Sequence, residues 1–212
     1  DYTAMTNKKP IPKRLKPADA MPTRYRLIKD VNKSPLRMRP AMSADAKARQ
    51  IITEHCDTVD RAALNVGSLY LMKYYTPKTR EDLEYYDAWP CTLIIGRFTT
   101  KGGEKRVIGL STHYYPPQIR RNILDRVFEM FRAEYKDRWA ALARKDLTAM
   151  EWELLYNNMR KYKLAFGCKA YIPQLMGECR YIPPSMWNIA VFTEGMFKKQ
   201  TREAVLKYWR NS

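Results

Sequence analysis

The chain has 212 residues, of which 45% are apolar, so it is long enough to bury one hydrophobic core and too apolar to be disordered throughout. It carries 39 Lys and Arg against 22 Asp and Glu, which gives a formal net charge of +17. This charge favours a polyanionic partner, nucleic acid first, over docking on an acidic protein. No window approaches the roughly 18 apolar residues of a membrane span, so we expect no membrane partner.

An extended basic arm is expected at residues 1–42. The first forty residues hold eleven Lys and Arg against three acids, together with six prolines. Proline blocks helix formation and like charges repel, so such an arm should be extended unless a partner holds it. Residues 43–212 are predicted to form a single α+β domain, with a β core at about 67–115 and a helical and mixed part at 116–212.

The domain should begin with a helix that Ser43 caps and that runs to about Asn65, because apolar residues recur at three-to-four spacing from Ile51. His55 lies on this apolar stripe and is interpreted as a core histidine rather than a metal ligand. The cysteines lack the short spacings of a zinc site, so we interpret them as reduced, mostly buried thiols and expect no metal and no cofactor. They are Cys56, Cys91, Cys168 and Cys179.

Strand-like segments follow the first predicted helix. They are SLYLMKYY, CTLIIGRF and RVIGLSTHY, at residues 68–75, 91–98 and 106–114. The last two are joined through Gly102-Gly103, which suits a tight hairpin turn. Three or four short strands of this kind predict a small SH3-like curled sheet or barrel, packed by several helices.

The part after the sheet should be largely helical. A helix is expected after Pro116-Pro117, because apolar residues recur there at four-residue spacing from Ile119. TAME, at 148–151, has capping-box spacing and predicts a second helix. Its inward residues should be Trp152, Leu155, Met159 and Tyr162. WNIAVF, at 187–192, is interpreted as a short buried strand, and Thr201 should cap a last helix.

The evidence for catalysis is weak. The sequence has no glycine-rich phosphate loop and no nucleophile elbow. A nuclease would need Mg²⁺ held by the acids of the loop from Glu81 to Asp87, with His113 or Lys105 as a base. Surface acids of this kind are more often simply solvated, and Asp87 is expected to tie its turn through backbone amides. We therefore predict a non-enzymatic protein.

Basic and aromatic residues interleave in three places. These are RYR at 24–26, KYKLAF with CKAY at 161–171, and KYWR at 207–210. Lys and Arg give phosphate affinity that is independent of sequence, and exposed aromatics can stack on bases, including the last pair of a duplex end. The alternative is that the aromatics belong to the core and only the basic tips reach solvent. Phe166, Trp187 and Trp209 are assigned to the core, and Tyr25 is assigned to contact with nucleic acid.

Candidate DNA contacts are chosen from these segments and from the strand and helix ends near them. His113 is included because it can contact phosphate, although a structural role at the strand-to-helix corner is favoured. The complete set is Arg24, Tyr25, Arg26, Arg97, Lys101, Lys105, Arg106, His113, Arg120, Arg121, Lys161, Lys163 and Lys169.

Several ordered motifs resemble one known family. They are Y-x-P-K-T at 75–79, L-x-Y-Y-D-x-W-P at 83–90, I-G-L-x-x-H-Y-x-P at 108–116, and the closing segment from 182 to 212. Together they are similar to the DNA-end protector proteins of T-even-like tailed bacteriophages. Ser111 stands where the family usually has asparagine, TTKGGEKR lengthens the hairpin, and Thr193-Glu194-Gly195 replaces a more proline-like turn.

The resemblance implies a virion or head-completion protein that binds double-stranded DNA at the genome terminus and shields it from host exonuclease. It implies contact with other virion proteins, and a location in the virion and in the host cytoplasm during assembly and after infection. The alternative is a structural adaptor of the neck or baseplate whose arm threads between subunits. In either case the frame would be formed by Tyr85, Tyr86, Asp87, Pro90, Gly109, Tyr114 and Trp187.

Overall fold

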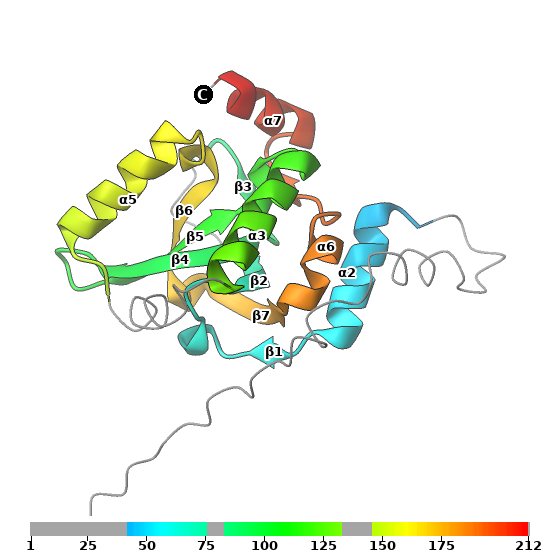
Figure 1. The fold of residues 1–212 in the computed structure, drawn as a ribbon, viewed down its shortest axis with the longest axis horizontal. Coiled ribbons are helices and arrows are strands. Elements are labelled where there is room, and N and C mark those ends of the chain that lie inside the picture. Colours follow the sequence, from blue (N-terminus) through cyan, green and yellow to red (C-terminus); the bar gives the residue numbers. More distant parts are fainter. Residues whose placement is uncertain (1–41, 76–82, 133–145, 212) are drawn as a thin grey trace, which may run out of the picture. The chain divides into compact units, whose positions relative to one another are not determined.

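A six-stranded antiparallel sheet lies at the centre of the protein (Figure 1). The computed structural model describes residues 42–75, 83–132 and 146–211, which belong to one unit, Arg39–Ser212. The strand order is β1-β7-β2-β4-β5-β6. The strands are β1 (Thr58–Val59), β2 (Leu69–Tyr74), β4 (Cys91–Thr99), β5 (Lys105–Ser111), β6 (Cys168–Tyr171) and β7 (Met176–Ile182). A second sheet pairs β3 (Tyr86–Asp87) with β8 (Phe197–Lys198).

The predicted α+β class is confirmed. The sheet is open, so the predicted SH3-like barrel is not confirmed. The three predicted strands correspond to β2, β4 and β5, and Gly103 sits in the expected hairpin turn with a φ of +79°. The predicted β core is too short, because β6 and β7 join the sheet from outside residues 67–115. These two consecutive strands do not pair with each other: β6 pairs with β5, and β7 pairs with β2 and β1.

Both faces of the central strands are covered. The consecutive residues from Leu69 to Met72 point alternately to opposite faces, and each is at most 2% exposed. One face carries a tyrosine-rich core in which the Tyr70 hydroxyl accepts from the Asn65 amide at 2.9 Å. The Tyr74 hydroxyl accepts from the Ile172 amide at 3.2 Å in the same way. Helix α2 (Ala44–His55) packs against α6 (Trp187–Ala190) and β7.

The first helix is shorter than the sequence predicts. Helix α2 (Ala44–His55) begins at the Ser43 cap as expected, but it ends ten residues before Asn65. The chain turns extended at Cys56, and β1 pairs with β7 through Thr58 opposite Arg180. Backbone pairing with a strand far along the chain therefore replaces the last helical turns. His55 is exposed, so its assignment to the core is wrong.

The later helices follow their sequence signals, with two corrections. They are α3 (Pro117–Arg132), α5 (Ala149–Lys161), α6 (Trp187–Ala190) and α7 (Arg202–Asn211). Thr148 and Glu151 form the predicted capping box, and Thr201 caps α7. Tyr162 is 66% exposed rather than inward, because it caps the end of α5 instead of continuing its stripe.

The segment WNIAVF is not a strand: its first four residues form α6 and the last two a turn, and it follows Pro183-Pro184, which cannot donate to a sheet ladder. Trp187 is 5% exposed, as its core assignment requires, and its indole nitrogen donates to the Ile182 carbonyl at 3.0 Å. Within the described residues, no helix has the length and apolar character needed to cross a bilayer.

Candidate functional site

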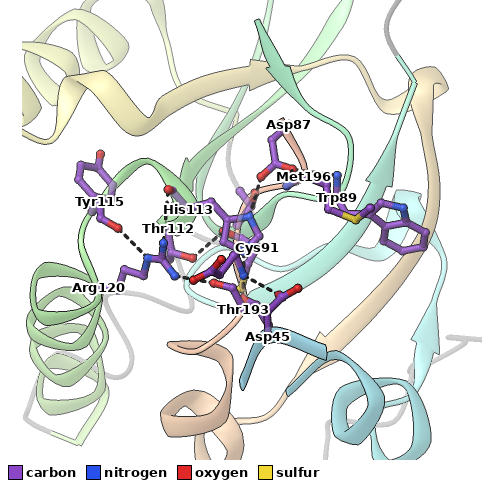
Figure 2. A network of polar contacts seen from close by, with 12 residues as sticks. Asp45, Asp87, Trp89, Cys91, Thr112, His113, Tyr115, Arg120, Thr193 and Met196 are labelled. Carbon is purple, nitrogen blue, oxygen red and sulfur yellow. Dashed lines mark hydrogen bonds and ion pairs between the residues drawn. The ribbon is translucent and has the colours of Figure 1, made fainter. Parts of the chain in front are cut away.

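The tyrosine-aspartate and histidine-tyrosine motifs meet in a buried polar network (Figure 2). His113 follows β5, in the 3-10 turn Thr112–Tyr114, and its Nδ1 lies 2.6 Å from Asp87 Oδ2 on β3. Its Nε2 lies 2.9 Å from the hydroxyl of Thr193, which comes from the segment after α6. The side chains of Asp87, His113 and Thr193 are at most 5% exposed. The network therefore fastens three distant segments together.

The imidazole of His113 is held neutral by its surroundings. Burial lowers its pKa below the ordinary value, and the nearby Asp87 carboxylate only partly offsets that shift. A neutral ring that donates from Nδ1 to Asp87 presents the lone pair of Nε2 to the Thr193 hydroxyl, whose single proton also faces the Ala190 carbonyl at 2.7 Å. Both ring nitrogens thus lie against a polar group of the protein.

Asp87 also satisfies two backbone amides. Its Oδ1 accepts from the amides of Trp89 and Met196, each at 3.0 Å. The first bond ties the turn before Pro90, as the sequence analysis predicted for this carboxylate. The second joins β3 to the segment that leads into β8. Asp87 therefore links its own turn to the chain's closing segment.

Arg120 lies beneath this network with no exposed surface. Its Nε donates to the Tyr115 carbonyl at 2.7 Å, and one terminal nitrogen donates to the carbonyls of Val191, at 3.0 Å, and Thr193. The guanidinium thus binds the start of α3 to the chain after α6. Burial lowers the pKa of Arg120 to about 10, so the side chain stays charged at neutral pH.

A second clamp holds the same segment from the side of α2. Asp45 Oδ1 accepts from the Glu194 amide at 2.7 Å and from Arg49 Nε at 2.8 Å. Arg49 in turn donates to the Glu194 carbonyl. Residues 193 and 194 therefore form hydrogen bonds with side chains from α2, α3 and the 3-10 turn of His113.

A carboxylate, an imidazole and a hydroxyl in this order can activate a nucleophile. Here all three groups are buried in the interior of the described structure. The nuclease alternative also loses Asp87, because both of its oxygens already accept hydrogen bonds. Glu81 and Asp82 lie outside the described residues. Among the described residues, no cluster of His, Cys, Asp and Glu is arranged to hold a metal ion.

Outside the polar network lies an aromatic cluster formed by Tyr85, Tyr114, Phe166, Phe197 and Tyr208. Tyr114 is 4% exposed and forms its base, with its ring edge-on to Phe166 and Phe197 at 5.5 and 5.2 Å. Tyr85 lies nearly parallel to Tyr208 of α7, at 12° and 6.1 Å between centroids. Tyr208 remains 46% exposed. We call these five residues the aromatic cluster.

Lys169 on β6 packs against the aromatic cluster. Its Nζ lies 4.4 Å from the centre of the Tyr114 ring and 5.5 Å from that of Phe166. Partial burial lowers the pKa of Lys169. The ammonium group is thus held against aromatic faces by cation–π attraction.

The predicted DNA contacts divide into separate groups. Lys101 and Lys105 are exposed on the β4–β5 hairpin, near the half-buried Arg97 and Arg106. A second group, Lys161, Lys163 and Lys169, lies where α5 ends and β6 begins. Helix α5 starts beside the hairpin, where the Leu147 amide donates to the Arg97 carbonyl, and its 13 residues span about 20 Å. The two groups therefore lie at opposite ends of this helix.

Two members of the predicted set are not surface residues. His113 and Arg120 have no exposed area and their polar atoms bind protein groups, so neither is available to phosphate. Arg121, the next residue on α3, is exposed and stays in the set. Arg24, Tyr25 and Arg26 lie outside the described residues, as does the side chain of Trp209. Phe166, which was assigned to the core, is half-buried.

Sequence reasoning missed Thr193, Asp45 and the pairing of Tyr85 with Tyr208. Thr193 had been noted only as a departure from the family pattern, although its hydroxyl and carbonyl serve both His113 and Arg120. The available signal was its place in the closing segment, which the sequence analysis grouped with the histidine motif in one family resemblance. Their separation of 80 residues hides the contact from any local pattern.

A comparison with known families gives a match over residues 31–212, to the family described as phage T4 terminal DNA protecting protein. The chain belongs to this family. The prediction of a bacteriophage protein that binds and protects DNA ends is therefore confirmed at the level of the family. Neither the comparison with curated proteins nor the comparison with solved structures found a match. The family match covers every segment that builds the buried network and the aromatic cluster.

Proposed function

We propose that this protein binds the terminus of the phage genome and shields it from host exonuclease without performing chemistry itself. The match to the terminal DNA protecting family over residues 31–212 carries this proposal. The net charge of +17 supports it, because cationic side chains gain affinity by releasing counterions from DNA. The interior position of the Asp87–His113–Thr193 network also supports a frame rather than a catalyst.

Protection of this kind needs only occupancy. An exonuclease must engage the last base pairs, so a protein that covers them excludes the enzyme for as long as it stays bound. The buried network holds the segments rigidly, and the exposed lysines supply phosphate affinity that is independent of sequence. We place the protein in the virion at the DNA terminus, and in the host cytoplasm during assembly and after infection.

An exonuclease-protection assay tests the proposal directly. Linear duplex is digested by an exonuclease that starts at ends, and nicked circular DNA by one that starts at the nick, each with and without the protein. Protection of the linear DNA alone is expected. Equal protection of both substrates would show general coating, and no protection of linear DNA at low salt would refute the proposal.

Salt dependence identifies the phosphate contacts. The logarithm of the binding constant should fall linearly with the logarithm of salt concentration, and each phosphate contact contributes a slope of about −0.9. The variant Lys101→Gln with Lys105→Gln should make the slope shallower by about two and weaken binding to all sequences alike. Arg61→Gln is the control, because it removes the charge of another exposed basic residue outside the hairpin. An unchanged slope in the double variant would remove the hairpin from the interface.

One observation favours the alternative of a structural adaptor as a second role. Met150 and Leu154 are 72% and 59% exposed and stand one turn apart on α5, which suits contact with another virion protein. Met150→Gln with Leu154→Gln should then reduce incorporation of the protein into particles and leave its DNA affinity unchanged. Normal incorporation of this variant would rule out a protein contact through α5.

A further inference from the structure

We propose that the aromatic cluster is a stacking platform for the terminal base pair, with Tyr208 as the residue that meets it. This inference rests on the proposed function, because it says how an end-binding protein recognises an end. Phosphate contacts cannot make this distinction, since a duplex interior presents the same backbone charge as a duplex end. What an end adds is one base-pair face that no neighbouring pair covers.

The geometry of Tyr208 fits this exposed face. One side of its ring lies nearly parallel to Tyr85, and 46% of the residue is exposed, which leaves surface for contact on the face turned away from Tyr85. A base pair laid on that face would continue the column of parallel rings. Stacking of this kind tolerates any sequence, because every base has a π-face.

The platform is held in place before DNA arrives. Tyr85 packs edge-on to Phe197 at 83°, and both rings contact Tyr114, whose burial was described above. Tyr114 belongs to the 3-10 turn that also carries His113, so the buried network fixes the base of the cluster. A preorganised surface loses less conformational entropy on binding than a mobile one.

Charge around the platform matches DNA. Lys207 and Arg210 are exposed on α7, the helix that carries Tyr208, and Lys198 is exposed on β8, the strand that carries Phe197. Lys169 lies over the other side of the cluster. Cations around an aromatic face suit a base pair whose strands carry phosphates at its edges, and they do not suit an apolar protein partner.

The test compares a short blunt duplex with relaxed closed circular DNA, which has no ends, at equal base-pair concentration. The wild-type protein should prefer the blunt duplex. Tyr208→Ala should reduce this preference about tenfold, from the loss of one base–aromatic stack. Tyr208→Leu keeps apolar contact with Tyr85 and should show the same loss, which separates stacking from packing, whereas Tyr208→Phe should retain the preference.

A fluorescent base analogue reports the contact itself. 2-Aminopurine at the terminal pair should be quenched on binding of wild type and Tyr208→Phe but not of Tyr208→Leu, and at a central pair it should not respond. Tyr75→Ala is the matched control, because Tyr75 is 49% exposed and contacts Lys73 rather than the cluster. This variant should behave as wild type.

The outcomes separate the two proposals. A wild-type protein without preference for the blunt duplex refutes end binding, and the platform with it. A wild-type preference that survives in Tyr208→Leu, with quenching intact, overturns the platform and leaves end binding standing. An equal loss on both DNAs in Tyr208→Leu also overturns the platform, because the ring then contributes nothing specific to ends.

Discussion

Replacing Arg120 by methionine should destabilise the protein severely. Methionine keeps an unbranched apolar stem in the space of the arginine stem, so the change removes mainly the guanidinium. Three carbonyls, those of Tyr115, Val191 and Thr193, then lose the donor that they have in the wild type. The neighbouring Arg121 offers a control, because it is exposed on the same helix.

The size of the effect follows from the cost of an unsatisfied buried group. Each orphaned carbonyl costs about 1–3 kcal/mol, so for three of them we expect a loss of about 3–9 kcal/mol in the free energy of unfolding. A domain of this size is typically stable by about 5–15 kcal/mol, so the variant should be close to unfolding. Arg121→Met should change the free energy of unfolding by less than about 0.5 kcal/mol.

Urea unfolding followed by circular dichroism and tryptophan fluorescence measures both variants. The midpoint of Arg120→Met should move to much lower urea with little change in the slope, and that of Arg121→Met should stay at the wild-type value. A wild-type midpoint for Arg120→Met would refute the reasoning. It would mean that the desolvation of the guanidinium, which lowers its pKa, cancels all that its hydrogen bonds contribute.

Changes at His113 and at Gly109 test the buried network and the packing of the sheet. Because burial lowers the pKa of His113, the unfolded chain takes up a proton near pH 6.5 that the folded protein does not, so stability should fall as the pH drops below about 6.5. His113→Gln should reduce this acid sensitivity in urea titrations at several pH values, whereas His55→Gln, at an exposed position, should not. Gly109→Ala would place a Cβ 2.1 Å from the Thr92 methyl carbon and should cost about 1–3 kcal/mol by thermal unfolding. Gly102→Ala, where the nearest atom is 3.9 Å away, should cost less, and equal losses would contradict the packing argument.

The sequence predicted best those features that depend on neighbours within one or two turns. The Thr148–Glu151 capping box and the Gly102-Gly103 hairpin formed as expected, and α3 begins at the proline pair, with Pro117 as its first residue. Their hydrogen bonds join residues three or four positions apart. Such contacts form wherever the local chain adopts the right dihedral angles, so the residue pattern is sufficient to predict them.

Two adjacent arginines show where that reasoning ends. By sequence, Arg120 and Arg121 are equivalent members of a basic helix turn, and both were predicted to contact DNA. One lies wholly inside the protein and the other outside, because carbonyls more than 70 residues away meet only the first. The error at His55 has the same origin, since His55 is the last residue of α2 and the elements that bury this helix, α6 and β7, lie far along the chain.

By itself, then, the amino-acid order determined the charge, the helix caps, the hairpin and the family motifs, all of which are written in composition or in short spacings. Only the tertiary structure decided that Asp87, His113 and Thr193 form an interior clamp and that Tyr85 and Tyr208 form a parallel pair at the surface. Burial and stacking depend on which distant segments meet. That choice is made by the packing of the whole core, not by any single stretch of sequence.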